Sequence, residues 1–210
     1  MRDREPLFQK YDFAANVRHA PEKLAAAVDE LSDDELMTDD VDRLIDRLVQ
    51  DHMFEIPVLS PERVETDEGE VQIEVSHDPR RAIFRHDGPV YVKATEYRFY
   101  VPYTGQRDAF FCHPSSYDFS PPYADVEKNE IVIRVTKHDD RQDAAAIRKE
   151  FEQALAKIET YLQRLRNDMS GLEDRLRQTA KARIDQRREK RKKDASLVDQ
   201  MGFPKRGSRL

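Results

Sequence analysis

The adjacent residues Cys112 and His113 are the first pair whose types could do chemistry, because a thiol can act as a nucleophile and an imidazole as its base. On a strand, however, neighbouring side chains point to opposite faces, so the two groups cannot readily form a hydrogen-bonded dyad. No third group that would orient the imidazole is identifiable. We therefore expect a half-buried cysteine, a surface histidine and no catalytic residue. An enzyme of unrecognised type is kept as an alternative, with a possible pocket around Arg98, Tyr103 and His113.

Metal and nucleotide sites have characteristic spacings that this sequence does not contain. Its six histidines are scattered, and none forms the i, i+4 pair of a helical metal site. The single cysteine excludes an internal disulfide and a multi-cysteine metal site. Only six glycines occur, and none belongs to a GxxxxGK or GxGxxG phosphate loop. The sequence therefore predicts neither a metal nor a cofactor.

A dense run of cations near the C-terminus is the best candidate for binding. On a helix these side chains would cover most of the circumference, with only Asp185 and Glu189 opposing them. Such a segment binds phosphates by Coulomb attraction and counterion release. The alternative roles are a solvated helix end, or an end that docks on an acidic protein surface such as that of a neighbouring protomer. The eight cations, within 13 positions, are Lys181, Arg183, Arg187, Arg188, Lys190, Arg191, Lys192 and Lys193.

The net charge changes sign near residue 140. Residues 1–140 carry 17 Lys+Arg and 31 Asp+Glu, a net charge of −14. Residues 141–210 carry 19 Lys+Arg and 11 Asp+Glu, a net charge of +8. An acidic first part followed by a basic tail indicates contact with a polyanion or with a partner surface.

The elements that must position these residues follow from hydrophobic spacing. Apolar residues at helical spacing predict a helical pair over about residues 20–52, with Pro21 at a first helical position and a capping box at Ser32 to Glu35. Short alternating apolar runs separated by turn residues predict antiparallel strands. The expected strands cover residues 71–75, 82–85, 90–103 and 130–135.

A near-heptad apolar stripe from Ile147 to Ile184 predicts long C-terminal helices. Gly171 is the one break, so either a single helix or a hairpin around 167–172 fits the pattern. The first half is expected to pack on the sheet, and the second half to be exposed or paired with another chain. The residues expected to pair helices, within or between chains, are Ile158, Leu162, Leu165, Leu172 and Leu176.

Two stretches of the sequence resemble a known group of proteins. One contains YVPYTG at 100–105, FFCHPS at 110–115 and the strand at 130–135; the other runs from Tyr161 through the basic helix to LVDQMGFP at 197–204. Over about residues 50–206 they resemble the N-terminal region of uncharacterised bacterial proteins that carry a C-terminal restriction-endonuclease-like (PD-(D/E)xK) domain. The resemblance implies a non-catalytic front module in defence against foreign DNA. The nuclease motif itself is absent here, so nuclease activity would lie in a domain outside this chain.

These observations predict an α+β protein with N-terminal helices, a central antiparallel sheet or small sandwich, and long C-terminal helices forming a coiled coil or helical hairpin. The expected segments are 1–52, 53–140, 141–200 and a linker-like 201–210. The expected function is a non-enzymatic binding and oligomerisation module, with itself, DNA or an acidic protein as partner. A stand-alone, sequence-independent DNA-binding protein is the alternative. The sequence has no apolar run of membrane-spanning length and no signal peptide, which favours a cytoplasmic protein without membrane contact.

Overall fold

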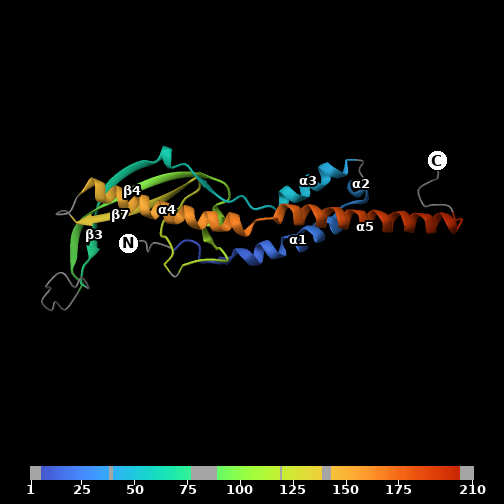
Figure 1. Cartoon of the computed structure of the whole chain (residues 1–210), viewed down its shortest axis with the longest axis horizontal. Helices are drawn as coiled ribbons and strands as arrows, with labels where there is room; N and C mark the ends of the chain where they lie inside the picture. Colours follow the sequence, from blue (N-terminus) through green and yellow to red (C-terminus); the bar gives the residue numbers. More distant parts are fainter. Residues whose placement is uncertain (1–5, 38–39, 77–88, 119, 139–142, 204–210) are drawn as a thin grey trace. The chain divides into compact units, whose positions relative to one another are not determined.

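A computed structural model of the chain describes residues 6–37, 40–76, 89–118, 120–138 and 143–203. They form an α+β fold with N-terminal helices, an antiparallel sheet and two long C-terminal helices, which confirms the predicted class (Figure 1). In chain order the elements are β1 (Tyr11–Asp12), α1 (Phe13–Glu30), α2 (Asp33–Leu36), α3 (Val41–His52), β2 (Val58–Leu59), the 3-10 turn η1 (Pro61–Arg63), β3 (Glu65–Glu74), β4 (Tyr91–Thr104), the 3-10 turn η2 (Arg107–Phe111), β5 (Cys112–His113), β6 (Asp125–Val126), β7 (Glu130–His138), α4 (Ala144–Asp168) and α5 (Leu172–Gln200).

The chain divides into two compact units, each built from two separate stretches of sequence. Unit 1 comprises Met1–Phe13 and Glu55–Asp168, and unit 2 comprises Ala14–Phe54 and Met169–Leu210. Unit 1 therefore contains every strand together with α4, whereas unit 2 contains α2, α3, α5 and nearly all of α1.

The sheet of unit 1 is centred on β4, which pairs antiparallel with β3 on one side and with β7 on the other. The short strands β2 and β6 extend it by pairing with β4 and β7. Strand alternation places Phe99 on the opposite face from Arg98 and Tyr100. Phe99 stacks on Phe151 of α4 with ring centroids 4.3 Å apart, so α4 covers the apolar face of the sheet, as the sequence predicted.

An N-terminal arm completes the core of unit 1. The side chains of Leu7 and Phe8 are fully buried, and the Phe8 ring stacks on Tyr161 of α4 at 5.0 Å between centroids. The backbone N–H of Phe8 donates to the carbonyl of Phe110 at 2.7 Å, and β1 then pairs in parallel with β5. Burial of two large apolar side chains holds this arm in place.

Unit 2 is a helical unit in which α5 contacts α2 and α3 (Figure 1). The predicted capping box is confirmed: the Ser32 hydroxyl accepts from the backbone N–H of Glu35, and the Glu35 carboxylate accepts from the N–H of Ser32. Asp40 caps α3 by accepting from the N–H of Arg43 at 3.1 Å. Helix α3 then buries four apolar side chains, those of Leu44, Ile45, Leu48 and Val49.

The observed helices depart from the prediction at the start of α1, whereas the break between the C-terminal helices lies where the sequence allowed one. Helix α1 begins at Phe13, so Pro21 lies inside the helix and not at its start. Burial of Val17, Ala20 and Leu24 on one face of α1 outweighs the lost hydrogen bond of the proline. Residues 169–171 separate α4 from α5, with Gly171 in the left-handed conformation at φ 69°. The strand predicted at 82–85 lies outside the described residues.

Candidate functional site

The arginines of the basic helix point into unit 2 and bind its N-terminal helices. Arg183 donates two hydrogen bonds to the carboxylate of Asp29 in α1, from Nε to Oδ1 at 2.7 Å and from Nη2 to Oδ2 at 2.6 Å. Arg191 forms an ion pair with Asp33 at the start of α2. The hydrogen bond from Arg183 holds the pKa of the Asp29 carboxyl below its usual value. These cations are therefore engaged within the chain.

Two further arginines hydrogen-bond to backbone carbonyls at helix ends. Arg187 donates to the carbonyls of Val28 and Leu31 at the C-terminal end of α1, and Arg188 donates to the carbonyl of Leu36, the last residue of α2, at 2.7 Å. The last carbonyls of a helix have no partner within the helix, and cations are favourable beside them. Arginines of α5 thus cap the C-terminal ends of α1 and α2.

The composition of unit 2 agrees with this internal pairing. Its N-terminal stretch, residues 14–54, carries 4 Lys+Arg and 11 Asp+Glu. Its C-terminal stretch, residues 169–210, carries 13 Lys+Arg and 6 Asp+Glu. The net charges of −7 and +7 cancel, so the charge break seen in the sequence is largely the complementarity between the two halves of one helical unit.

The lysines of the predicted site remain on the surface. All four are exposed, and Lys192 lies 3.6 Å from Glu189. The same stretch of α5 also exposes four carboxylates, so its outward charges balance. The outward cations are Lys181, Lys190, Lys192 and Lys193, and the outward anions are Asp185, Glu189, Asp194 and Asp199. This balance weakens the attraction of the helix for a polyanion.

The residues predicted to pair helices are buried in the single chain. Each has at most 1% of its surface exposed: Ile158, Leu162 and Leu165 on α4, and Leu172 and Leu176 on α5. The second half of the stripe packs within unit 2, whereas the sequence predicted that it would be exposed or paired with another chain. Substitution of these leucines would therefore change the stability of the chain before it changed any association between chains.

The side chains of Arg98, Tyr103 and His113 do not converge on one pocket. Each contacts a different neighbour in the fold. Arg98 forms an ion pair with Asp67, with 3.0 Å between Nε and Oδ1. Five positions along β4, Tyr103 faces the other side of the sheet, and its hydroxyl donates to the carbonyl of Glu127 at 2.8 Å. His113 lies on β5, outside the main sheet, with its ring 5.4 Å from that of Tyr117.

The Cys112 side chain is buried, and its thiol donates to the backbone carbonyl of Asp108 at 3.4 Å. Burial raises the pKa of this thiol to about 11. The thiolate, which is the nucleophilic form, is therefore scarce at neutral pH. This environment does not activate the cysteine.

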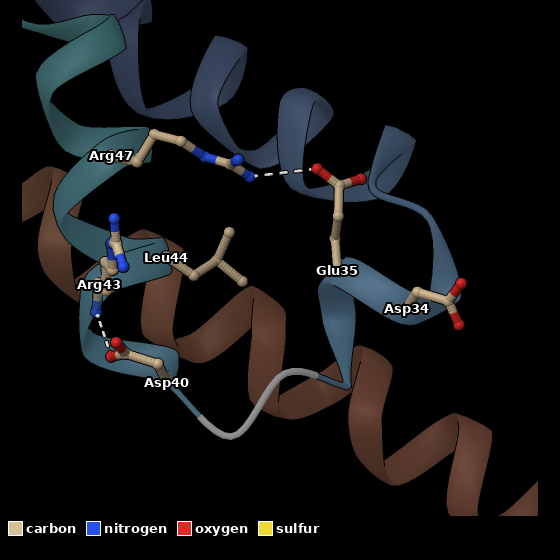
Figure 2. Close-up of a pocket in the computed structure, with 6 residues that line it drawn as sticks. All are labelled: Asp34, Glu35, Asp40, Arg43, Leu44 and Arg47. Carbon is tan, nitrogen blue, oxygen red and sulfur yellow. Dashed lines mark hydrogen bonds and ion pairs between the residues drawn. The ribbon is translucent and has the colours of Figure 1, made fainter.

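A surface cavity of about 540 Å³ lies between α2 and α3. Figure 2 shows the Arg47 guanidinium reaching to the carboxylate of Glu35, at 3.2 Å, beside the apolar side chain of Leu44. Its lining residues are Asp34, Glu35, Asp40, Arg43, Leu44 and Arg47. Among its described lining residues there is no cysteine, serine, threonine or histidine, and two of the carboxylates cap helices.

The end of α5 and the residues just after it carry a feature that the sequence-based prediction missed. Four large apolar side chains there are in water, with exposed fractions of 55% for Leu197, 41% for Val198, 62% for Met201 and 78% for Phe203. We call these four residues the apolar tip. A cavity of about 470 Å³, lined in part by Val198, Ala195 of α5 and Met37, lies next to it. Apolar residues at i, i+1 and i+4 in a polar helix were the available sequence signal.

No protein-family model, curated protein or solved structure matches this chain. Among the described residues, no group of three or more histidine, cysteine, aspartate and glutamate side chains could hold a metal ion. In the part of the chain that the structure describes, no helix is both long enough and apolar enough to span a membrane.

Proposed function

We propose that this chain is a non-enzymatic binding and oligomerisation module that serves a bacterial defence-type nuclease system in the cytoplasm. The resemblance seen in the sequence supplies the biological setting. The apolar tip is the observation that carries the binding role, because large apolar side chains that are exposed and lie close together in the sequence favour burial against a partner. Each such side chain contributes about 1 kcal/mol or more when it is fully covered.

A second copy of the chain is the partner that fits the apolar tip best. Opposite charges follow one another along the same stretch, with Lys190 and Lys193 before Asp194 and Asp199. Two tips that pair antiparallel can bring these opposite charges together while they cover the apolar side chains. The module then joins copies through the ends of α5.

The test is the mass of the chain in solution, measured by size-exclusion chromatography with light scattering. We expect a dimer that becomes a monomer in the Leu197→Glu/Met201→Glu variant. A matched control, Gln178→Glu/Ala182→Glu, adds the same charge at exposed positions of α5 and should leave the dimer unchanged. A wild-type chain that stays monomeric at high concentration would overturn the oligomerisation role.

The second candidate is sequence-independent DNA binding through the four outward lysines of α5. Because at most four lysines are available, the slope of log K against log salt should be no steeper than about −4. Replacement of Lys190 and Lys193 by alanine should then weaken binding and flatten the slope. Unchanged DNA affinity in that variant would exclude this role.

A further inference from the structure

Strand β3 is an edge strand with one side open. Through its ten residues it pairs with β4, from Glu65 opposite Tyr100 to Glu74 opposite Tyr91. Within the described part of the chain, no residue pairs with its other side. Every second residue of an edge strand presents its N–H and C=O outward, which here leaves roughly five residues able to bind another strand.

The open edge is strongly acidic. Half of the ten residues of β3 are carboxylates and none is a lysine or arginine. Unit 1 as a whole carries 19 Lys+Arg and 25 Asp+Glu, a net charge of −6, whereas unit 2 is neutral. The carboxylates are Glu65, Asp67, Glu68, Glu70 and Glu74.

The carboxylates on the two faces of β3 differ in whether an arginine engages them. Arg98 of β4 lies across Gly69, where a Cβ atom would be 2.6 Å from its Nη2, and it forms an ion pair with Asp67. Among the described residues, Glu68 and Glu70 have no ion-pair partner, and both are exposed on the same face of the strand. The backbone edge is therefore formed in advance, and the two carboxylates on this face of the strand are exposed beside it.

Electrostatics selects the class of strand that can add to this edge. A second β3 would place carboxylates opposite carboxylates, which is destabilising in cross-strand pairs. Nucleic acid would be repelled for the same reason. An added strand that carries Lys or Arg at alternate positions would instead place opposite charges across from Glu68 and Glu70.

We propose that the outer edge of β3 is a docking site for an extended basic peptide, which adds to the sheet as a further strand. Backbone hydrogen bonds supply the binding common to all extended peptides, and alternate basic side chains supply the preference. This site lies on unit 1 and is independent of the apolar tip, so either one can fail without the other.

The probe is a labelled ten-residue peptide of alternating lysine and threonine, with binding followed by fluorescence anisotropy. We expect the full chain to bind it and the Glu68→Lys/Glu70→Lys variant to bind it about tenfold more weakly or worse. A matched control, Glu152→Lys/Glu159→Lys, makes the same change of charge on the exposed side of α4 and should lower affinity far less.

Two N-methylated peptides separate strand addition from simple charge attraction. Methyl groups on alternate amides block edge pairing in one register and leave it intact in the other. We therefore expect one of the two peptides to lose binding and the other to keep it. If both bind like the parent peptide, or if the β3 and α4 variants lose affinity equally, the docking site is refuted.

Discussion

Replacement of Arg187 and Arg188 by methionine tests whether α5 is held by its own chain. Methionine keeps an aliphatic side chain of comparable reach but removes the donors to the carbonyls of Val28, Leu31 and Leu36. A hydrogen bond to a charged group contributes about 1.5–3 kcal/mol, and partial solvation lowers this to about 1 kcal/mol per carbonyl. The double variant should therefore lose about 3 kcal/mol of the opening free energy of unit 2.

Hydrogen exchange read by mass spectrometry is the appropriate assay because it reports unit 2 separately from unit 1. Amides of α1, α2 and α5 should exchange about 100-fold faster in the arginine variant, since every 1.4 kcal/mol is a factor of ten. The matched control is Lys190→Met/Lys193→Met, for which no described residue offers a charge partner and which should shift exchange only slightly. Equal effects of the two variants would refute the internal capping of α1 and α2 by α5.

Three further outcomes follow from the contacts of single side chains. Since the hydrogen bond from Arg183 holds the pKa of Asp29 below its usual value, the stability from this pair is present at neutral pH and is lost as the pH falls through the folded pKa. Asp29→Asn should remove that acid-dependent part of the stability in urea titrations. Cys112, with its pKa raised to about 11, should react with a disulfide reagent far more slowly in the folded than in the urea-unfolded chain, and equal rates would contradict its burial. Phe151→Ala, which removes the ring stacked on Phe99, should lower the free energy of unfolding by about 3–5 kcal/mol, whereas Phe203→Ala should leave it nearly unchanged.

Local spacing in the sequence was enough to predict the class of fold and most of its elements. The capping box at Ser32, the apolar face of α3 and the alternation along β4 all depend on residues a few positions apart. Pro21 misled the prediction of where α1 begins, because the proline preference is local and the burial of Val17 and Leu24 depends on the tertiary fold.

The partners of the basic helix could not be predicted from spacing. Arg183 and Asp29 are 154 positions apart, so no window of sequence contains both. The eight cations looked alike in the sequence, yet the structure divides them into arginines that bind the chain and lysines that face water. The guanidinium of arginine carries five N–H donors in a fixed planar fork that can bridge helix-end carbonyls, whereas the lysine ammonium is a compact, strongly hydrated charge that is favoured in water.

Unit 2 joins stretches that leave the ribosome far apart in time. Every residue of unit 1 has been synthesised once Asp168 is added, whereas residues 14–54 must wait for α5 before their carboxylates and helix-end carbonyls meet the arginines. During translation the nascent α1 and α3 helices therefore hold their apolar faces without a cover, while the sheet can already fold. Unit 2 can thus complete its internal contacts only after α5 has been synthesised.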